Sequence, residues 1–82
     1  MNSEIFAHVQ RIAADVLRLP LERVTSQTSP QNVEHWDSVE HLNLTLALEQ
    51  ELGVKFQPED IEQMNDIAAV VQLVELKLGS RR

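Results

Sequence analysis

The chain has 82 residues and no cysteine, which allows one small hydrophobic core and excludes disulfides, a thiolate nucleophile and cysteine zinc sites. Hydrophobic residues make up 43% and aromatic residues only 4%, with two glycines and three prolines, so the composition favours helices over strands. The net charge of −6 comes from residues 34–62, which hold eight acidic residues and one lysine. Such a surface repels nucleic acid and attracts basic partner proteins, although it would equally serve solubility alone.

Helical periodicity marks the first segment, from about residue 2 to residue 19. Apolar side chains recur at spacings of three and four between Ile5 and Leu17. Asn2 or Ser3 can cap the start of this helix, and Pro20 stops it.

A long loop is predicted for residues 20–36, where the periodicity fails and serine, threonine, asparagine and proline accumulate. We expect Leu21, Val24 and Val33 to pin it to the core. A loop of this length in a small domain is usually functional or partly mobile. Trp36, near its end, either presents an exposed indole to a partner or anchors the loop over the core.

A second helix is predicted from Asp37 or Ser38 to Leu52. Asp37 and Glu40 have the spacing of a capping box, in which Asp37 accepts from first-turn amides and Glu40 reaches back. Gly53 supplies the left-handed residue that ends the helix.

Two more helices complete the predicted fold. A short one covers residues 58–62, with proline in its first turn, and the last runs from about Asp66 to Leu78, with Asn65 or Asp66 as its cap and Gly79 after it. The sequence therefore predicts an all-α fold, a small bundle of three main helices plus one short helix with a long loop between the first and second. We assign residues 1–79 to the domain and residues 80–82 to a disordered tail.

Apolar residues of the second helix fall into two arcs when it is projected at about 100° per residue. One arc contains Leu44, Leu48 and Leu52, with His41 and Thr45 within or beside it. The other contains Val39, Leu42 and Leu46. The first arc belongs to the core. The second is either more core, wrapped by the loop, or an exposed apolar strip bordered by carboxylates that fits a groove lined by Arg and Lys.

Ser38 lies where this second arc begins, and it lacks the surroundings of a catalytic nucleophile. A serine nucleophile needs a base that is itself oriented by a third group, and His41 is one helical turn away. No nucleophile-elbow glycines surround Ser38, and a small helical chain offers little room for a cleft, so we expect no hydrolase. His8, His35 and His41 lack zinc-like spacing, so no metal site is expected either.

Residues 36–54, WDSVEHLNLTLALEQELGV, resemble the attachment region of acyl carrier proteins. The resemblance covers nearly the whole chain: an opening helix, a long loop, Asp-Ser at the start of an acidic helix, a short helix and a closing helix. It implies that a phosphopantetheinyl transferase esterifies Ser38 with 4'-phosphopantetheine from coenzyme A. Asp37 would cap the helix and offer this transferase a carboxylate. The arm would then carry an acyl or aminoacyl group as a thioester.

The resemblance also implies, position by position, a surface for partners and an inward face for cargo. The partner-docking residues would be Trp36, Val39, Glu40, Leu42, Asn43, Leu46, Glu49 and Gln50. The acyl-pocket candidates are His41, Leu44, Met64, Ile67, Val70 and Val71. Further partners would be an acyl- or aminoacyl-loading ligase and downstream transferases or synthases with basic docking surfaces.

Several positions depart from the pattern of fatty-acid carriers. Val39 stands where leucine or methionine is usual, and Trp36 stands where these carriers often have a small residue. Asn43 and Gln50 stand where carboxylates are usual. These departures favour a specialised carrier in a dedicated lipid, polyketide or secondary-metabolite pathway. The alternative is an unmodified acidic adaptor that binds basic partners through the second helix.

Neither a membrane span nor a signal peptide is expected. The longest apolar run covers residues 67–71, far short of the roughly 20 residues that span a bilayer. The N-terminus lacks a basic stretch followed by an apolar segment. We expect a cytoplasmic monomer.

Overall fold

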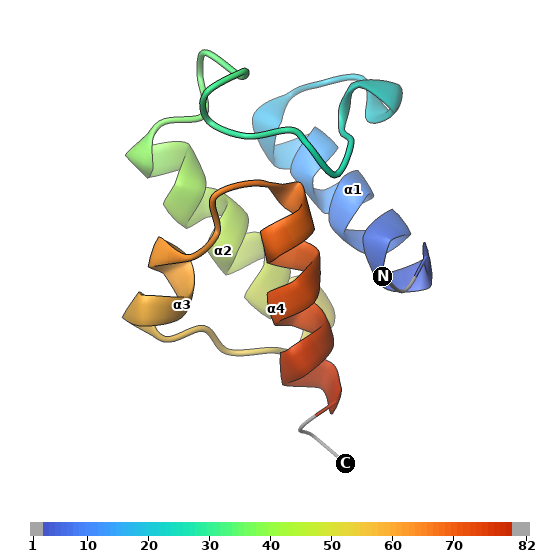
Figure 1. Cartoon of the computed structure of the whole chain (residues 1–82), viewed down its shortest axis with the longest axis vertical. Coiled ribbons are helices and arrows are strands. Elements are labelled where there is room, and N and C mark those ends of the chain that lie inside the picture. Colours follow the sequence, from blue (N-terminus) through green and yellow to red (C-terminus); the bar gives the residue numbers. More distant parts are fainter. Residues whose placement is uncertain (1–2, 80–82) are drawn as a thin grey trace.

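Four α-helices and one turn of 3₁₀-helix form the described part of the chain. The computed structural model describes residues 3–79. In order, the elements are α1 (Ser3–Leu17), η1 (Leu21–Arg23), α2 (Ser38–Leu52), α3 (Pro58–Glu62) and α4 (Ile67–Gly79). The predicted all-α bundle is confirmed (Figure 1), whereas the tail predicted for residues 80–82 lies outside the described residues.

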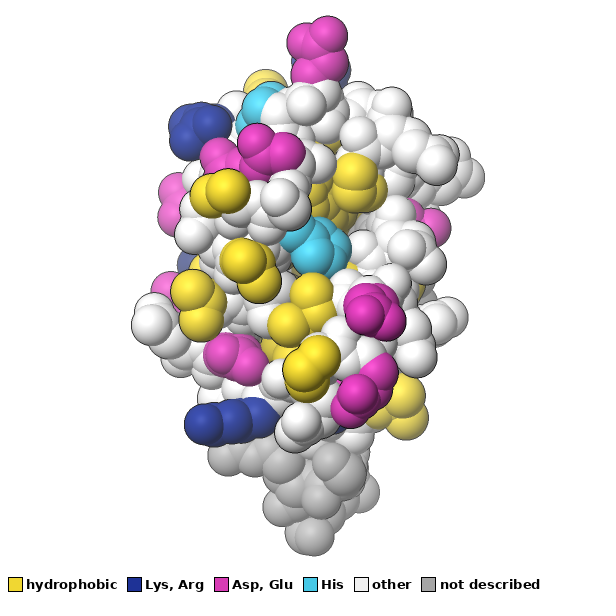
Figure 2. Space-filling model, turned by 90° about the vertical axis from the view of Figure 1, so that its left-hand side faces the viewer, with side chains coloured by type: hydrophobic (Ala, Val, Ile, Leu, Met, Phe, Trp, Pro, Cys, Tyr) yellow, Lys and Arg dark blue, Asp and Glu magenta, His cyan; other side chains and the backbone are white. Residues whose placement is uncertain are grey.

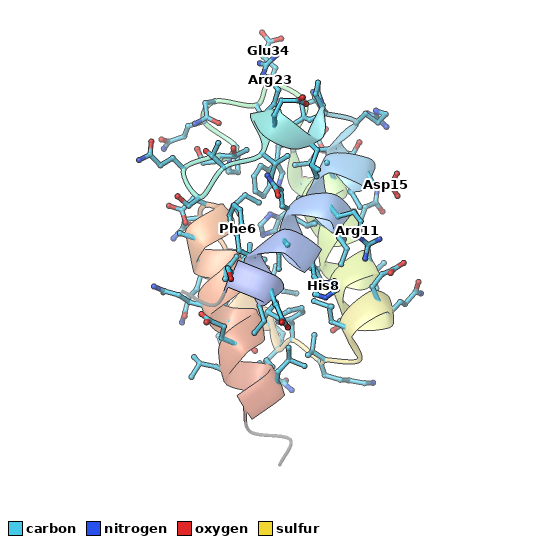
Figure 3. All side chains as sticks on the ribbon, turned by 90° about the vertical axis from the view of Figure 1, so that its right-hand side faces the viewer. Phe6, His8, Arg11, Asp15, Arg23 and Glu34 are labelled. Atoms are coloured by element: carbon cyan, nitrogen blue, oxygen red, sulfur yellow. The ribbon has the colours of Figure 1, made fainter. Side chains whose placement is uncertain are left out.

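Helix α1 packs against both α2 and α4. In Figure 3, α1 crosses in front of these helices, with Phe6 on the α4 side and Arg11 and Asp15 on the α2 side. Residues three and four apart lie on the same face of a helix, so the apolar residues of α1, which recur at these spacings, form one inner face. The buried residues of this face are Val9, Ile12, Ala13, Ala14 and Leu17.

Helix α1 ends at Leu17, before the predicted end at residue 19, because the backbone turns left-handed at Arg18 (φ 57°). The amide of Leu19 then donates to the carbonyl of Ala14 at 2.9 Å. This bond is the long one of a Schellman turn, here built without glycine. The turn aims Arg18 away from α1 and toward α2.

The long loop is pinned to the bundle at both sides. Gln10 of α1 donates through Nε2 to the carbonyls of Leu21 (3.1 Å) and Val24 (2.9 Å). At the other side, the first amide of α4, that of Ile67, donates to the carbonyl of Thr28 at 2.9 Å. Val24 and Val33 are buried as predicted, but the Leu21 side chain is 50% exposed and is not the expected anchor. Its carbonyl makes the contact instead.

The two arcs of α2 face opposite environments, as the projection requires. Leu44, Thr45 and Leu48 are buried in the core. Val39, Leu42 and Leu46 are exposed by 64%, 54% and 54%. The predicted second arc is therefore an apolar strip on the surface and not additional core.

Three of the predicted helix-end residues take their expected positions, whereas of the two cap candidates for α1, Asn2 lies outside the described residues and Ser3 is the first residue of the helix. Asp37 Oδ1 accepts from the amide of Glu40 at 3.0 Å, Gly53 is left-handed (φ 67°), and Asp66 Oδ1 accepts from the amide of Ala69 at 2.8 Å. Gly79 is the last residue of α4 and not the residue after it. No helix within residues 3–79 is both long and apolar enough to cross a membrane.

Candidate functional site

Ser38 is exposed and is the first residue of α2. The amides of a first helical turn have no carbonyl partners within the helix, and the helix dipole is positive there. Asp37 occupies one of these amides, that of Glu40. The hydroxyl of Ser38 is thus held on a capped helix end, where a phosphodiester is electrostatically favoured.

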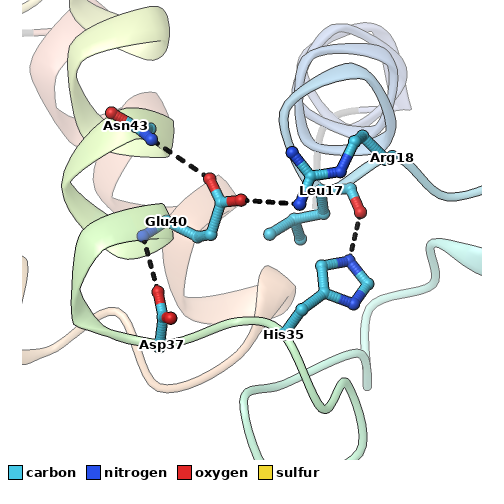
Figure 4. Close-up of polar contacts among 6 residues, drawn as sticks. All are labelled: Leu17, Arg18, His35, Asp37, Glu40 and Asn43. Atoms are coloured by element: carbon cyan, nitrogen blue, oxygen red, sulfur yellow. Dashed lines mark hydrogen bonds and ion pairs between the residues drawn. The ribbon is translucent and has the colours of Figure 1, made fainter.

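Glu40 does not complete the predicted capping box. Its carboxylate accepts from Arg18 Nη2 at 3.0 Å and from Asn43 Nδ2 at 3.1 Å (Figure 4). Arg18 reaches it from the left-handed turn after α1. A carboxylate held from two sides has no reason to fold back onto the backbone, so the expected reciprocal bond is wrong.

His41 is hydrogen bonded through both ring nitrogens. The indole Nε1–H of Trp36 donates to Nδ1 at 3.0 Å, so the proton of the neutral ring lies on Nε2. Nε2 donates to the carbonyl of Ile61 in α3 at 3.1 Å. Because neither nitrogen is left to accept a proton from Ser38, these contacts disfavour a serine–histidine catalytic pair.

Trp36 belongs to the core and not to the docking surface. Its side chain is only 3% exposed, and its ring stacks on His41 with centroids 5.9 Å apart. The expectation that Trp36 contacts partners is therefore corrected, because burying the indole on the core satisfies both its ring and its N–H group. Trp36 instead anchors the loop over the core, which is the alternative that the sequence left open.

A pocket of about 420 Å³ opens next to Ser38. The loop, α2 and α3 all contribute to it. Its lining residues are Pro30, Trp36, Asp37, Ser38, His41, Leu42 and Ile61. Of the six acyl-pocket candidates, only His41 lines this pocket. The other five, Leu44, Met64, Ile67, Val70 and Val71, are buried in the core.

The surface beside this pocket is apolar along α2 and acidic around it. Figure 2 shows hydrophobic side chains in a row, with carboxylates scattered at its borders. Asn43 and Gln50 are exposed. Glu49 is half-buried and accepts from the amide of Phe56 at 2.9 Å. Both carboxylates of the predicted docking set, Glu40 and Glu49, therefore already have partners within the protein.

Helix α3 is held in place by an ion pair. Asp60 Oδ2 lies 2.8 Å from Lys77 Nζ of α4 and also accepts from the amide of Gln57 at 2.8 Å. The hydrogen bond from Lys77, followed by that from Gln57, lowers the pKa of the Asp60 carboxyl. Since α3 carries Ile61, this ion pair supports one wall of the pocket.

The family model for the phosphopantetheine attachment site matches residues 7–74, most of the chain. The chain belongs to the phosphopantetheine-bearing acyl carrier proteins. It is 33% identical over 78 residues to an acyl carrier protein of Petrotoga mobilis, covering 95% of this chain and 92% of the relative. An acyl carrier protein of Thermosynechococcus vestitus is 31% identical over 79 residues, covering 96% and 98%.

A solved structure agrees with this family. The holo acyl carrier protein of Geobacter metallireducens superposes with a TM-score of 0.84 at 25% identity, covering 93% of this chain and 87% of that one. The chain is accordingly a non-catalytic carrier, as expected. Within residues 3–79, no three histidine, aspartate or glutamate side chains are grouped in a way that could hold a metal.

Sequence reasoning missed three residues of this region: Arg18, Pro30 and Ile61. Arg18 binds Glu40 from the turn after α1, and Pro30 and Ile61 line the pocket from the loop and α3. All three residues lie outside α2. The apolar periodicity of α2 cannot indicate which residues of other segments lie next to it.

Proposed function

We propose that Ser38 carries the phosphopantetheine arm and that the protein presents acyl or aminoacyl thioesters to partner enzymes. The observation that supports this most is the position of Ser38, exposed on the capped first turn of α2 between a pocket and an apolar strip. The first-turn amides and dipole favour the phosphodiester. Asp37 would cap the helix and also meet the transferase.

The chemistry of attachment belongs to the transferase. The Ser38 oxygen attacks the β-phosphorus of coenzyme A and forms a new P–O bond. The bond between that phosphorus and the oxygen bridging the two phosphates breaks, and 3',5'-adenosine bisphosphate leaves with this oxygen and the bonding electron pair. The serine proton must go to a base of the transferase, because both nitrogens of His41 are engaged. Exposure of Ser38, rather than activation, is what this chain supplies.

Partner enzymes would dock on the strip of Val39, Leu42 and Leu46. These side chains are exposed, and covering their apolar surface would favour binding. Asn43 and Gln50 lie exposed along it, while Glu40 and Glu49 would have to exchange their present partners. Such a surface suits the transferase, a loading ligase and downstream transferases or synthases with basic rims. We place this carrier in a dedicated lipid, polyketide or secondary-metabolite pathway, and in the cytoplasm.

Intact mass spectrometry tests the attachment. The protein is incubated with coenzyme A, magnesium and a broad-specificity phosphopantetheinyl transferase, and the mass is expected to rise by one arm. Ser38→Ala should stay unmodified. Ser3→Ala is the matched control, because Ser3 is also an exposed first residue of a helix, and it should load like the wild type.

The outcome separates the carrier from the acidic adaptor. If the mass does not rise, or rises equally in Ser38→Ala, attachment at Ser38 is refuted. An adaptor would keep its partner binding in Ser38→Ala, whereas a carrier loses its function completely.

A further inference from the structure

Three segments of the chain meet in one line of hydrogen bonds at the wall of the pocket beside Ser38. Trp36 of the loop donates to His41 of α2 at 3.0 Å, and His41 donates to the carbonyl of Ile61 in α3 at 3.1 Å. All three residues line the pocket. We call this line of bonds the latch.

The core lies directly behind the latch. The hydroxyl of Thr45 donates to the carbonyl of His41 at 2.9 Å and lies 3.9 Å from Met64 Sδ. Thr45 and Met64 are both buried. A chain that passed from the pocket toward Met64 would have to push His41 aside, leaving the indole N–H and the Ile61 carbonyl without their partners. Both hydrogen bonds are partly buried, and partly buried polar groups that lose their partners oppose such an opening.

We propose that the latch determines cargo length, so that this carrier shelters short acyl groups in the pocket and excludes long chains from its core. This inference rests on the proposed attachment of the arm to Ser38. The flexible arm folds back, and the thioester with a short acyl group lies between Leu42, His41 and Ile61. A longer chain stays in solvent or on a partner enzyme.

A chain-length series tests the latch. Holo-protein is loaded with acetyl, butyryl, octanoyl or dodecanoyl groups, and the rate of thioester cleavage by hydroxylamine is compared with that of the same acyl-pantetheine. Each sheltered methylene should slow cleavage about fourfold. In the wild type, butyryl should be cleaved more slowly than acetyl, and dodecanoyl no more slowly than butyryl.

Variants distinguish the latch from a general effect on packing. His41→Leu replaces the imidazole with an apolar side chain and so removes both hydrogen bonds of the latch. Because a long chain could then enter the core, cleavage of the dodecanoyl thioester should be at least about fourfold slower than in the wild type. Leu42→Ala is the control, because it trims the pocket without touching the latch. In this variant the butyryl thioester should be cleaved faster than in the wild type, and the cleavage rate of the dodecanoyl thioester should be unchanged. Trp36, the one tryptophan of the chain, adds a direct readout, since its emission should change with butyryl.

Two results overturn the latch: dodecanoyl better protected than butyryl in the wild type, or a folded His41→Leu protein with an unchanged chain-length profile. If His41→Leu does not fold by circular dichroism, the wild-type series decides alone. Intact mass before loading separates the two proposals. A protein that never receives the arm refutes both, whereas a loaded protein with the wrong profile refutes only the latch.

Discussion

Two leucines of α2 offer a direct test of the division between the core and the proposed docking strip. Leu48 is fully buried and Leu46 is 54% exposed, although only one residue separates them. Truncating Leu48 to alanine removes buried methyl groups and leaves a cavity, at a cost of about 2–5 kcal/mol. A domain of 82 residues has a total stability of about 4–12 kcal/mol, so Leu48→Ala removes a large share of it.

Leu46→Ala should behave in the opposite way. Its side chain is half in water already, so the free energy of unfolding should change by no more than about 0.5 kcal/mol. Burying the exposed half of a leucine at an interface contributes about 1 kcal/mol to binding. Leu46→Ala loses this contribution, so kcat/KM for loading by the transferase should fall about fivefold.

Urea unfolding followed by circular dichroism measures the stability of both variants, and intact mass measures the rate of arm transfer. The expected pattern is a stability loss confined to Leu48→Ala and a loading loss, at equal stability, in Leu46→Ala. Equal stability losses in the two variants would show that the second arc is core. Unchanged loading in Leu46→Ala would show that the strip is not where the transferase docks.

Three further predictions concern the charges around α2 and α3. Asp37→Ala should lower the free energy of unfolding by about 1 kcal/mol in urea unfolding, whereas Asp37→Asn keeps a cap and should slow only arm transfer. Arg18→Ala should cost less than about 1 kcal/mol, because the Arg18 side chain of this ion pair is 70% exposed, although that of Glu40 is only 14% exposed, and it should speed transfer at low salt by freeing the carboxylate. The lowered pKa of Asp60 means that its bond to Lys77 stabilises the fold above the usual carboxyl pKa and that this stability is lost as pH falls through the lowered value. Asp60→Asn should therefore melt below the wild type at neutral pH, and the difference should vanish in acid; a difference independent of pH would refute this.

Local features of this chain could be predicted from its sequence because they depend on neighbours within a few residues. The cap at Asp37, the left-handed Gly53 and the Asp66 cap each follow from one residue type at a helix end. The two arcs of α2 follow from helical periodicity alone. The periodicity could not say which arc faced water, and the exposure of Leu42 and Leu46 answers that.

The errors arise where distant segments compete for the same group. Glu40 suited a capping box locally, but Arg18, 22 residues earlier, takes its carboxylate. Trp36 suited a partner contact as well as a core contact, and its burial in the core depends on how the whole bundle packs around it, even though its hydrogen-bond partner His41 is only five residues away. A single sequence does not say which segments meet, so these contacts could not be predicted.

The contacts around Ser38 have one physical consequence in common. Asp37 holds the first turn of α2, Arg18 ties that turn to α1, and the latch ties it to the loop and α3. A helix turn held by these contacts would present Ser38 to different enzymes in the same orientation, and under the proposed attachment the freedom needed to reach their active sites would lie in the arm. Rigidity at Ser38 and mobility beyond it together raise the local concentration of the cargo at a docked partner. In the proposed carrier, the first turn of α2 would therefore be the fixed point of attachment, and the strip beside it the surface on which partners would bind.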